Sequence, residues 1–148
     1  MRLEIPAKIK TILVTGGAGF IGGWLVRRLL EETKVNIINI DKMSYASDLE
    51  GINILLPKIN LNNNKRYTFF KVDLCDAKKI SEIIKSYKPD FIMHLAAESH
   101  VDRSIDSPRD FINSNIIGTF NLLEATKNYY SALSNQKKEA FRFLHIST

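Results

Sequence analysis

The feature of this sequence that most limits its possible folds is the glycine-rich segment Thr15-Gly-Gly-Ala-Gly-Phe-Ile-Gly22. Apolar and β-branched residues before it predict a buried strand over 11–15, and the helical spacing of apolar residues after it predicts a helix over about 20–32. A strand, a glycine turn and a helix in this order aim free backbone N–H groups and the positive end of the helix dipole at the turn. The segment therefore predicts a site for phosphate groups, with an ordinary glycine-rich hairpin as the alternative.

The glycines satisfy two spacings that are typical of dinucleotide-binding turns, Gly17-x-Gly19-x-x-Gly22 and the wider Gly16-x-x-Gly19-x-x-Gly22. In such a turn the first glycine allows a positive φ, the middle one leaves room for a pyrophosphate, and the last lets the helix lie close to the strand. Asp41 ends the next apolar run, where a carboxylate can bind the ribose hydroxyls of NAD and repel the 2′-phosphate of NADP. We therefore expect NAD as the cofactor.

Composition excludes several other classes of protein. With 148 residues, 45% of them hydrophobic and 25% charged, the chain is expected to form one domain with a real core. Its net charge is +5, but the Lys and Arg residues are scattered and not gathered with aromatic residues, so no nucleic-acid partner is expected. The lack of a long apolar run or a signal-peptide core, together with a single cysteine, predicts a cytoplasmic protein without membrane association. That cysteine, Cys75, is expected to pack as a small hydrophobe.

Strand-like and helix-like segments alternate along the rest of the chain, which predicts an α/β fold with a parallel sheet. Further strands are expected over 35–40, 67–72, 91–97 and 141–148. Helices are expected after the capping box Ser47-x-x-Glu50 with an end at Pro57, after a cap at Asp76, and from a cap at Ser107 to about residue 130. The remaining segments are predicted to be a loose leader over 1–10, a loop tip over 62–64 and a polar turn over 98–106.

These segments predict a Rossmann-type doubly wound parallel sheet with strand order 3-2-1-4-5. Ligands bind such a sheet at the carboxyl ends of its strands, at the switch between the first and the fourth. The glycine turn, Asp41, Asp73 and the loop 96–103 are all expected there. Because the chain stops at Thr148, the fifth strand is expected to be an unprotected edge. We therefore expect residues 1–148 to be an incomplete NAD-binding domain, from the N-terminal part of a longer enzyme.

Six segments together resemble the extended short-chain dehydrogenase/reductases. Within that group the sequence is most similar to the sugar-nucleotide 4,6-dehydratases, with the dTDP-glucose 4,6-dehydratase family as the best match. The glycine turn is common to the whole group, whereas Ala96-Ala-Glu-Ser-His-Val-Asp-Arg-Ser104 is much more specific to the dehydratases. The segments that carry the resemblance are Thr15–Gly22, Asp41–Tyr45, Lys71–Asp76, His94–Ser104, Asn115–Thr119 and His145–Thr148.

The resemblance implies contacts with NAD from the glycine turn, the ends of the second and third strands, the loop after the fourth strand and the long helix. The implied residues are Gly16, Gly19, Phe20, Ile21, Gly22, Asp41, Lys42, Met43, Ser44, Asp73, Leu74, Leu95, Ala96, Ala97, Glu98, Ser99 and Ser114. It also implies that Ser99 and Thr148 contact the substrate dTDP-glucose, with Thr148 as a substrate-positioning residue of the catalytic site. A homodimer of the full-length parent is implied as well.

The implied reaction converts dTDP-glucose to dTDP-4-keto-6-deoxyglucose for deoxysugar biosynthesis. NAD takes a hydride from carbon 4, an Asp/Glu pair eliminates water across carbons 5 and 6, and the hydride returns to carbon 6. In the family this Asp/Glu pair directly follows the position of Thr148, and a Tyr-x-x-x-Lys motif comes later, so the activity is expected of a longer parent enzyme and not of residues 1–148 alone. The alternatives are a sugar-nucleotide 4-epimerase, another nucleotide-sugar 4,6-dehydratase, and a non-catalytic dinucleotide-binding module.

A metal site is also conceivable, because Glu98, His100 and Asp102 alternate within one loop. Alternation inside a loop does not bring side chains together, and no second cluster of ligands accompanies it, so none is expected.

Three other polar residues have structural interpretations. His94 and His145 lie within apolar strands and are interpreted as hydrogen-bonded core histidines. Asn115 is interpreted as fixing the loop after the fourth strand. Arg103 is expected either to contact a diphosphate or to pair with Asp106.

Overall fold

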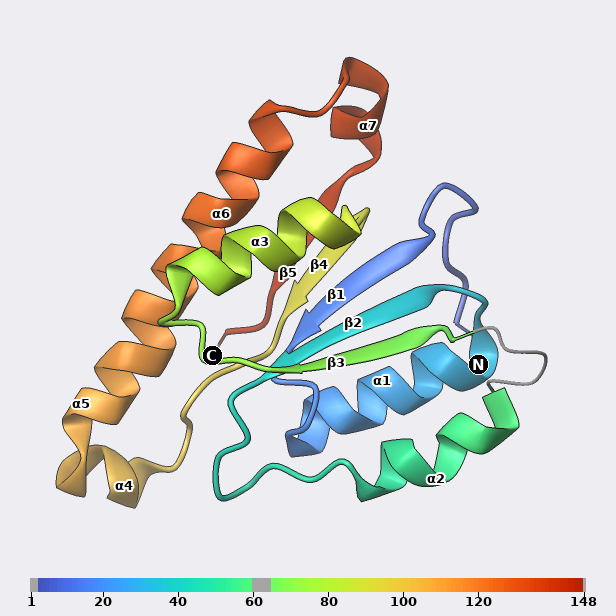
Figure 1. Cartoon of the computed structure of the whole chain (residues 1–148). Coiled ribbons are helices and arrows are strands. Elements are labelled where there is room, and N and C mark those ends of the chain that lie inside the picture. The colour runs from blue at the N-terminus through green and yellow to red at the C-terminus, as the bar shows by residue number, and fades with distance from the viewer. Residues whose placement is uncertain (1–2, 60–64, 148) are drawn as a thin grey trace.

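Five parallel strands form a single sheet in the order β3-β2-β1-β4-β5 (Figure 1). The structure, a computed structural model, describes residues 3–59 and 65–147. The Rossmann-type sheet with strand order 3-2-1-4-5 is therefore confirmed. The elements in chain order are β1 (Thr11–Thr15), α1 (Phe20–Glu32), β2 (Asn36–Asp41), α2 (Glu50–Ile59), β3 (Tyr67–Lys71), α3 (Ala77–Tyr87), β4 (Phe91–His94), α4 (Val101–Asp106), α5 (Pro108–Phe111), the π-helical η2 (Ile112–Gly118), α6 (Thr119–Ser131), α7 (Asn135–Ala140) and β5 (Arg142–His145).

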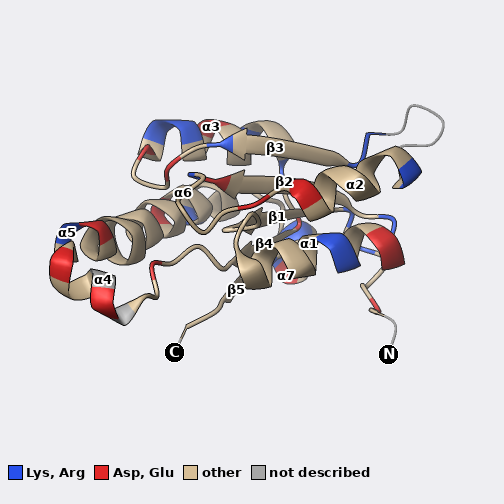
Figure 2. Ribbon diagram, turned by 90° about the horizontal axis from the view of Figure 1, so that it is seen from below, with Lys and Arg blue, Asp and Glu red and all other residues tan. Residues whose placement is uncertain are grey.

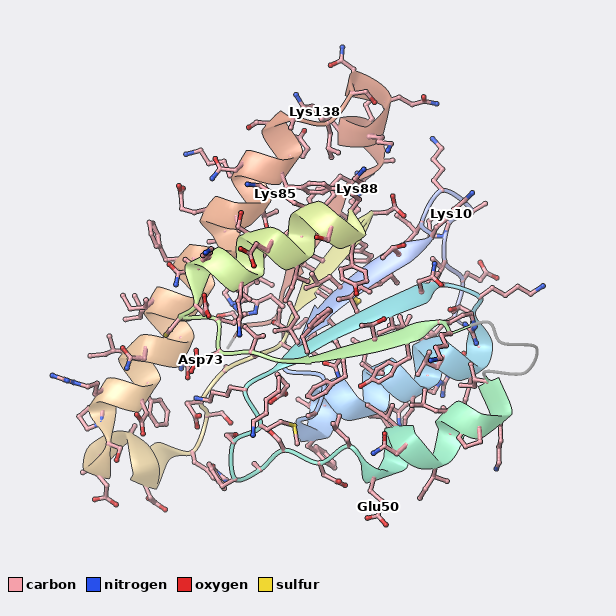
Figure 3. The ribbon with its side chains drawn as sticks, viewed as in Figure 1. Lys10, Glu50, Asp73, Lys85, Lys88 and Lys138 are labelled. Atoms are coloured by element: carbon pink, nitrogen blue, oxygen red, sulfur yellow. The ribbon has the colours of Figure 1, made fainter. Side chains whose placement is uncertain are left out.

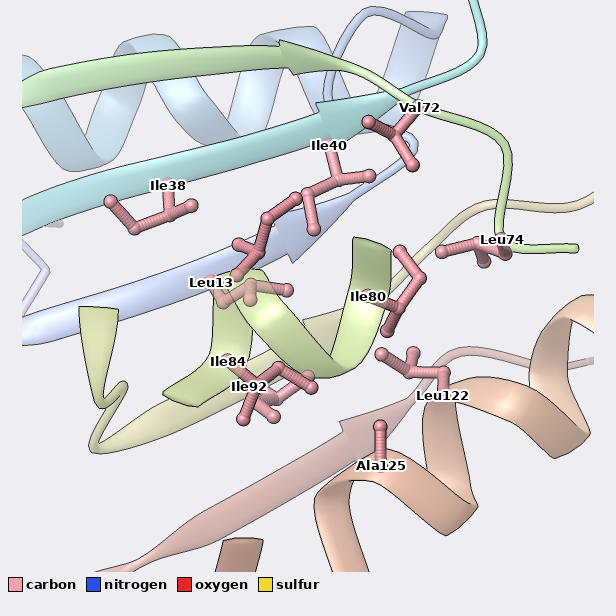
Figure 4. Packing of buried hydrophobic residues seen from close by; sticks show 11 residues of the cluster. Leu13, Ile38, Ile40, Val72, Leu74, Ile80, Ile84, Ile92, Leu122 and Ala125 are labelled. Carbon is pink, nitrogen blue, oxygen red and sulfur yellow. The ribbon is translucent and has the colours of Figure 1, made fainter. Parts of the chain in front are cut away.

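Helices cover both faces of the sheet, because the side chains of its central strands are apolar on both sides. Leu13 and Ile38 point toward α3 and α6 and pack with Ile80, Ile84 and Leu122, as Figure 4 shows. The neighbouring residues of the same strands point the other way, toward α1 and α2, and form a second cluster with the helix residues Val26, Leu29, Leu30 and Ile52. These two clusters fix the position of the strand ends at which the polar loops begin.

The chain leaves β1 and β4 toward opposite faces of the sheet. Thr15 and His94 are paired in register at the ends of these strands. After Thr15 the chain turns into α1 on one face, and after His94 it runs out to α4 and then to α6 on the other (Figure 1). A crevice at the carboxyl end of the sheet is the expected result of this switch.

The connection after β2 differs from the sequence expectation. The hydroxyl of Ser47 donates to Asp41 Oδ1, and Asp48 Oδ1 accepts the N–H of Glu50, so the predicted capping box at Ser47 is wrong. Helix α2 runs through Pro57 and ends at Ile59, so the predicted stop at Pro57 is also wrong. A proline removes one hydrogen bond from a helix, and here the last turn continues beyond it. The predicted loop tip at 62–64 lies outside the described residues.

The segment from 91 to 140 also differs from expectation. Strand β4 ends at His94 and not at residue 97. His94 is paired with Thr15, the last residue of the neighbouring strand β1. The predicted polar turn over 98–106 contains the helix α4. The predicted helix from Ser107 to about 130 is helical without a gap from Pro108 to Ser131, but its middle, η2, is π-helical between α5 and α6. Ser107 does precede α5, but no described side chain makes a cap hydrogen bond there. Asp76 caps α3 by accepting the N–H of Lys79, as predicted.

Three further predictions, one about a segment and two about single residues, are wrong. Residues 3–10, the described part of the predicted leader, are not loose, because Ile9 is buried, Leu3 packs on the core and the Leu3 N–H donates to Glu32. Cys75 is exposed, with its sulfur 3.4 Å from the carbonyl oxygen of Asn113. His145 is exposed as well, because β5 forms an edge of the sheet.

Candidate dinucleotide-binding site

A cavity of about 440 Å³ opens at the carboxyl ends of the central strands. Its wall is built from the turn after β1, the loops after β2, β3 and β4, and η2. The lining residues are Gly16, Gly19, Phe20, Ile21, Gly22, Ile40, Asp41, Lys42, Ser44, Tyr45, Ala46, Ser47, Val72, Asp73, Leu74, Leu95, Ala96, Ala97, Glu98, Ser99, His100 and Ser114. The volume is within the range of small-molecule and cofactor sites.

The glycine turn forms one end of the cavity. Gly16 has a φ of +74°, and a Cβ there would lie 2.6 Å from the backbone nitrogen of Ala96. A Cβ on Gly22 would lie 2.1 Å from the carbonyl oxygen of Gly16, so glycine at this position lets α1 start directly against the turn. These two positions show that the wider frame, Gly16-x-x-Gly19-x-x-Gly22, shapes the turn.

Gly19 is the N-cap of α1, and no described side chain caps this end. The first turn of α1 carries no acidic residue. The leading N–H groups and the positive dipole end therefore face the cavity without a carboxylate of the chain to compete for them. This end of the cavity has the chemistry that a pyrophosphate requires.

Asp41 lies at the end of β2, on the cavity wall, with only 8% of its surface exposed. Its Oδ2 accepts the N–H of Ala18 at 3.0 Å, which joins the carboxylate to the glycine turn. Its Oδ1 accepts the N–H of Met43 at 2.8 Å and the hydroxyl of Ser47 at 3.0 Å. A carboxylate has about four acceptor positions. Three protein donors therefore fix its orientation and leave acceptor capacity for a ribose hydroxyl.

An ion pair crosses the cavity wall from the loop after β2 to the loop after β4. Lys42 Nζ lies 2.8 Å from Glu98 Oε1 and donates to Ser114 Oγ at 2.7 Å. Ser114 is part of η2, so three elements meet at one ammonium group. The wide turn of a π-helix is frequently found at functional sites, and here it contributes a wall of the cavity.

Asn115 of η2 holds the loop after β4 by two hydrogen bonds to one residue. Its Oδ1 accepts the N–H of Glu98 at 2.8 Å, and its Nδ2 donates to the carbonyl of Glu98 at 2.9 Å. The interpretation of Asn115 as a residue that fixes this loop is confirmed.

His94 is fully buried beneath the cavity at the end of β4. Its Nδ1 lies 2.6 Å from Thr15 Oγ1 and its Nε2 lies 2.9 Å from Thr119 Oγ1, so it is the hydrogen-bonded core histidine that was predicted. Burial, and next the neighbouring His145 ring stacked at 4.8 Å, lower the pKa of His94 from 6.5 to about 4. The imidazole is therefore neutral at pH 7, and it connects β1, β4 and α6.

The structure brings nearly all of the predicted site residues to one place. Of the proposed NAD contacts, only Met43 does not line the cavity; it has a φ of 60° and contributes its N–H to Asp41. Thr148 and the side chain of Arg103 lie outside the described part of the chain. Figure 3 shows Asp73 at the point where the chain leaves β3, at the carboxyl end of the sheet.

The sequence reasoning missed six lining residues, which are Ile40, Tyr45, Ala46, Ser47, Val72 and His100. Tyr45 and His100 are the most informative of these, because their rings stack at 5.8 Å from two different loops. No spacing rule predicts that contact. Each of the two residues directly follows a segment of predicted NAD contacts, and this position in the sequence was the one indication that it could line the cavity.

Other kinds of site find little support. Among the described residues, no three His, Cys, Asp or Glu side chains gather into a group that could hold a metal ion. Figure 2 shows acidic and basic positions interspersed along the helices. No helix in the described ranges has the length and apolar character needed to span a membrane.

Comparison with known proteins defines the family. Residues 13–148 match the family described as GDP-mannose 4,6 dehydratase. This chain belongs to that family. It is 49% identical over 139 residues to dTDP-glucose 4,6-dehydratase of Neisseria gonorrhoeae, covering 94% of this chain and 38% of the relative. It is 53% identical over 137 residues to dTDP-glucose 4,6-dehydratase of Escherichia coli, covering 93% of this chain and 36% of the relative.

Solved structures of the family have the same fold in their matching part. The chain aligns with a dTDP-glucose 4,6-dehydratase of Bacillus anthracis in complex with NAD, with a TM-score of 0.72 and 28% identity, over 94% of this chain and 37% of that one. It also aligns with the dTDP-glucose 4,6-dehydratase DesIV of Streptomyces venezuelae, with a TM-score of 0.69 and 34% identity, over 80% of this chain and 36% of that one. This chain thus spans little more than a third of the length of the relatives that it matches.

Proposed function

We propose that this chain is the NAD-binding part of a dTDP-glucose 4,6-dehydratase. The observation that carries the proposal is that an uncapped helix N-terminus and the carboxylate of Asp41 face the same cavity. Support also comes from relatives about half identical to this chain that are dTDP-glucose 4,6-dehydratases, and from a similar structure solved with NAD. The bound NAD would supply reversible hydride transfer to and from the sugar.

The residues of this chain would bind and orient the cofactor. The turn Gly16–Gly22 and the start of α1 would hold the pyrophosphate, and Asp41 would accept hydrogen bonds from the adenosine ribose. Asp73 and Leu74 would contact the adenine. The loop Leu95–Ser99 would place the nicotinamide end, because Asn115 fixes its backbone through Glu98.

The substrate would be reached at the far end of the same loop. Ser99 lines the cavity and is exposed, so its hydroxyl is available to a sugar hydroxyl beside the nicotinamide. Thr148 would position the substrate as in the family, and the acid–base residues of the reaction would follow it. The acid and base that transfer protons in the reaction would then lie outside residues 3–147.

The test is an activity assay on the protein as its gene encodes it. We expect loss of water from dTDP-glucose, measured by mass spectrometry of the nucleotide sugar, with no comparable reaction of UDP-glucose or GDP-mannose. Turnover of GDP-mannose in place of dTDP-glucose would show another nucleotide-sugar 4,6-dehydratase. Recovery of an epimerised sugar of unchanged mass would show a 4-epimerase. A protein that binds NAD and turns over none of these sugars would be a binding module.

We also propose that the protein forms a homodimer through η2 and α6. Ile112, Ile116, Phe120 and Leu123 are exposed and follow one another at spacings of four and three residues, so they lie on one side of this helical segment. An exposed apolar stripe of this length is typical of a protein interface. We expect a dimer in sedimentation velocity for the full-length protein and a monomer for Phe120→Lys. A wild-type monomer would contradict this proposal.

The proposed compartment is the cytoplasm. The chain has one cysteine, Cys75, and its thiol is free and exposed, which suits a reducing environment. Fractionation of the source cells with an antibody against the protein is the measurement. Recovery outside the cytoplasmic fraction would refute this location.

A further inference from the structure

We propose that Glu98 sets the preference for NAD over NADP by holding the ammonium group of Lys42 away from a 2′-phosphate. The proposal deepens the proposed function and rests on it, because it concerns the same cavity and the same cofactor. It assigns the discrimination to two residues in addition to Asp41. Glu98 is a positioning residue in this scheme, since it acts on the phosphate through Lys42.

Lys42 directly follows Asp41 in the sequence, and both residues line the cavity. In dinucleotide-binding folds, a cationic side chain near the ribose acid accommodates the 2′-phosphate of NADP. Lys42 therefore lies close to the place where a cation would favour NADP. Its sequence position alone would weaken the selectivity for NAD that Asp41 provides.

The structure shows why Lys42 is not available for that role. Its Nζ is 2.8 Å from Glu98 Oε1 and 2.7 Å from Ser114 Oγ, so two of its three donor positions are used within the chain. The side chain of Glu98 is only 12% exposed and that of Lys42 is 33% exposed, so solvent screens this pair less than it screens a surface pair. The ammonium group is turned toward the loop after β4.

The partner of Lys42 is itself held firmly. Both the N–H and the carbonyl of Glu98 are hydrogen-bonded to the side chain of Asn115 in η2. The carboxylate of Glu98 is therefore presented from a fixed backbone, and Ser114 next to Asn115 holds the other side of the ammonium group. A preorganised pair of this kind is costly for an incoming phosphate to separate.

The charge of the cavity wall makes this pairing decisive. Among the described residues that line the cavity, Lys42 is the only lysine or arginine, while Asp41, Asp73 and Glu98 are acidic. The labelled lysines Lys10, Lys88 and Lys138 lie toward the other end of the sheet (Figure 3). A 2′-phosphate would meet Asp41 and find no unpaired cation among these lining residues. Once the charge of Glu98 is removed, Lys42 becomes able to pair with the phosphate.

The experiment measures the dissociation constants of NAD and NADP by titration calorimetry on the full-length protein. We expect Glu98→Gln to raise the affinity for NADP relative to NAD about ten-fold, because the isosteric amide leaves the wall in place and removes the charge that retains Lys42. In the double variant Glu98→Gln/Lys42→Met the ratio should return to the wild-type value. The matched control is Glu50→Gln, which removes one negative charge from an exposed residue that neither lines the cavity nor pairs with Lys42, and should change the ratio less than three-fold.

The ratio of the two affinities separates this role from a structural one, since damage to the loop would weaken both cofactors together. If the wild type prefers NAD and Glu98→Gln has the same ratio of NADP affinity to NAD affinity, this inference is overturned and the proposed function still stands. A ratio that rises equally in Glu50→Gln, or that stays raised in the double variant, would also overturn it. A wild-type protein that binds neither cofactor would refute the proposed function and this inference with it.

Discussion

Lowering the pH from 7.5 to 5.0 should destabilise this chain through one buried histidine. His94 has no exposed surface, and its two ring nitrogens lie 2.6 Å and 2.9 Å from the hydroxyl oxygens of Thr15 and Thr119. A second proton on the ring would place a charge in the buried core, next to the stacked His145 ring. These effects lower the pKa of His94 from 6.5 to about 4 in the folded protein.

The size of the effect follows from these two pKa values. Between pH 6.5 and 4 the unfolded chain binds a proton at His94 that the folded chain does not, so the free energy of unfolding rises with pH in this window. The stabilising contribution is complete above pH 6.5 and is lost as the pH falls toward 4. For a step from pH 7.5 to 5.0 the contribution of His94 is about 2 kcal/mol. No aspartate or glutamate with a lowered pKa is needed to produce this slope.

The assay is urea unfolding of the wild type and His94→Gln at both pH values. Subtracting the two pH dependences isolates His94, because the other titrating groups are shared; we expect about 2 kcal/mol more loss in the wild type. The NMR titration of the wild-type imidazole provides a reading that does not depend on a variant. A midpoint near 6.5, or equal slopes in wild type and His94→Gln, would refute the reasoning.

Two further substitutions test the support of the sheet and of the cavity. Arg66→Met should lower the free energy of unfolding, measured in urea, by about 2 kcal/mol. The guanidinium of Arg66 donates to three carbonyls at the end of α1, those of Leu30 at 2.8 Å, Thr33 at 2.9 Å and Val35 at 3.2 Å. An unchanged stability would contradict this role. Asn115→Ala should weaken NAD binding about ten-fold in calorimetry by releasing the backbone of Glu98; equal binding by the wild type and this variant would count against the role of Asn115 in holding the loop after β4.

The sequence was sufficient to predict the fold because its strongest signals are local and periodic. The glycine turn, the apolar strands and the stripe of α3 each determine one element without reference to distant residues. The order of the strands then follows from alternating strands and helices. The glycine turn, Asp41, Asp73 and the loop after β4 were placed at the cavity for the same reason, because they lie at the carboxyl ends of strands, whereas the remaining lining residues that were predicted came from the family resemblance.

The parts that the sequence did not predict depend on contacts between loops. The ion pair of Lys42 with Glu98 and the stacking of Tyr45 on His100 both join the loop after β2 to the loop after β4. No spacing within the sequence indicates such a pair. The π-helical segment η2 within the long helix was not predicted either, and it supplies the residues that hold the loop after β4.

The most direct test of the central claim is a calorimetric titration of NAD into the wild type and a variant of the glycine turn. A Cβ on Gly19 would meet the carbonyl oxygen of Gly16 at 3.3 Å, and the branches of a valine would extend toward the pyrophosphate position. A Cβ on Gly23, which does not line the cavity, would meet Gly17 at an ordinary 3.6 Å. We expect one NAD per chain in the wild type and in Gly23→Ala, and binding at least about 100-fold weaker in Gly19→Val with an unchanged circular dichroism spectrum. Normal NAD binding by Gly19→Val, or none by the wild type, would contradict the account.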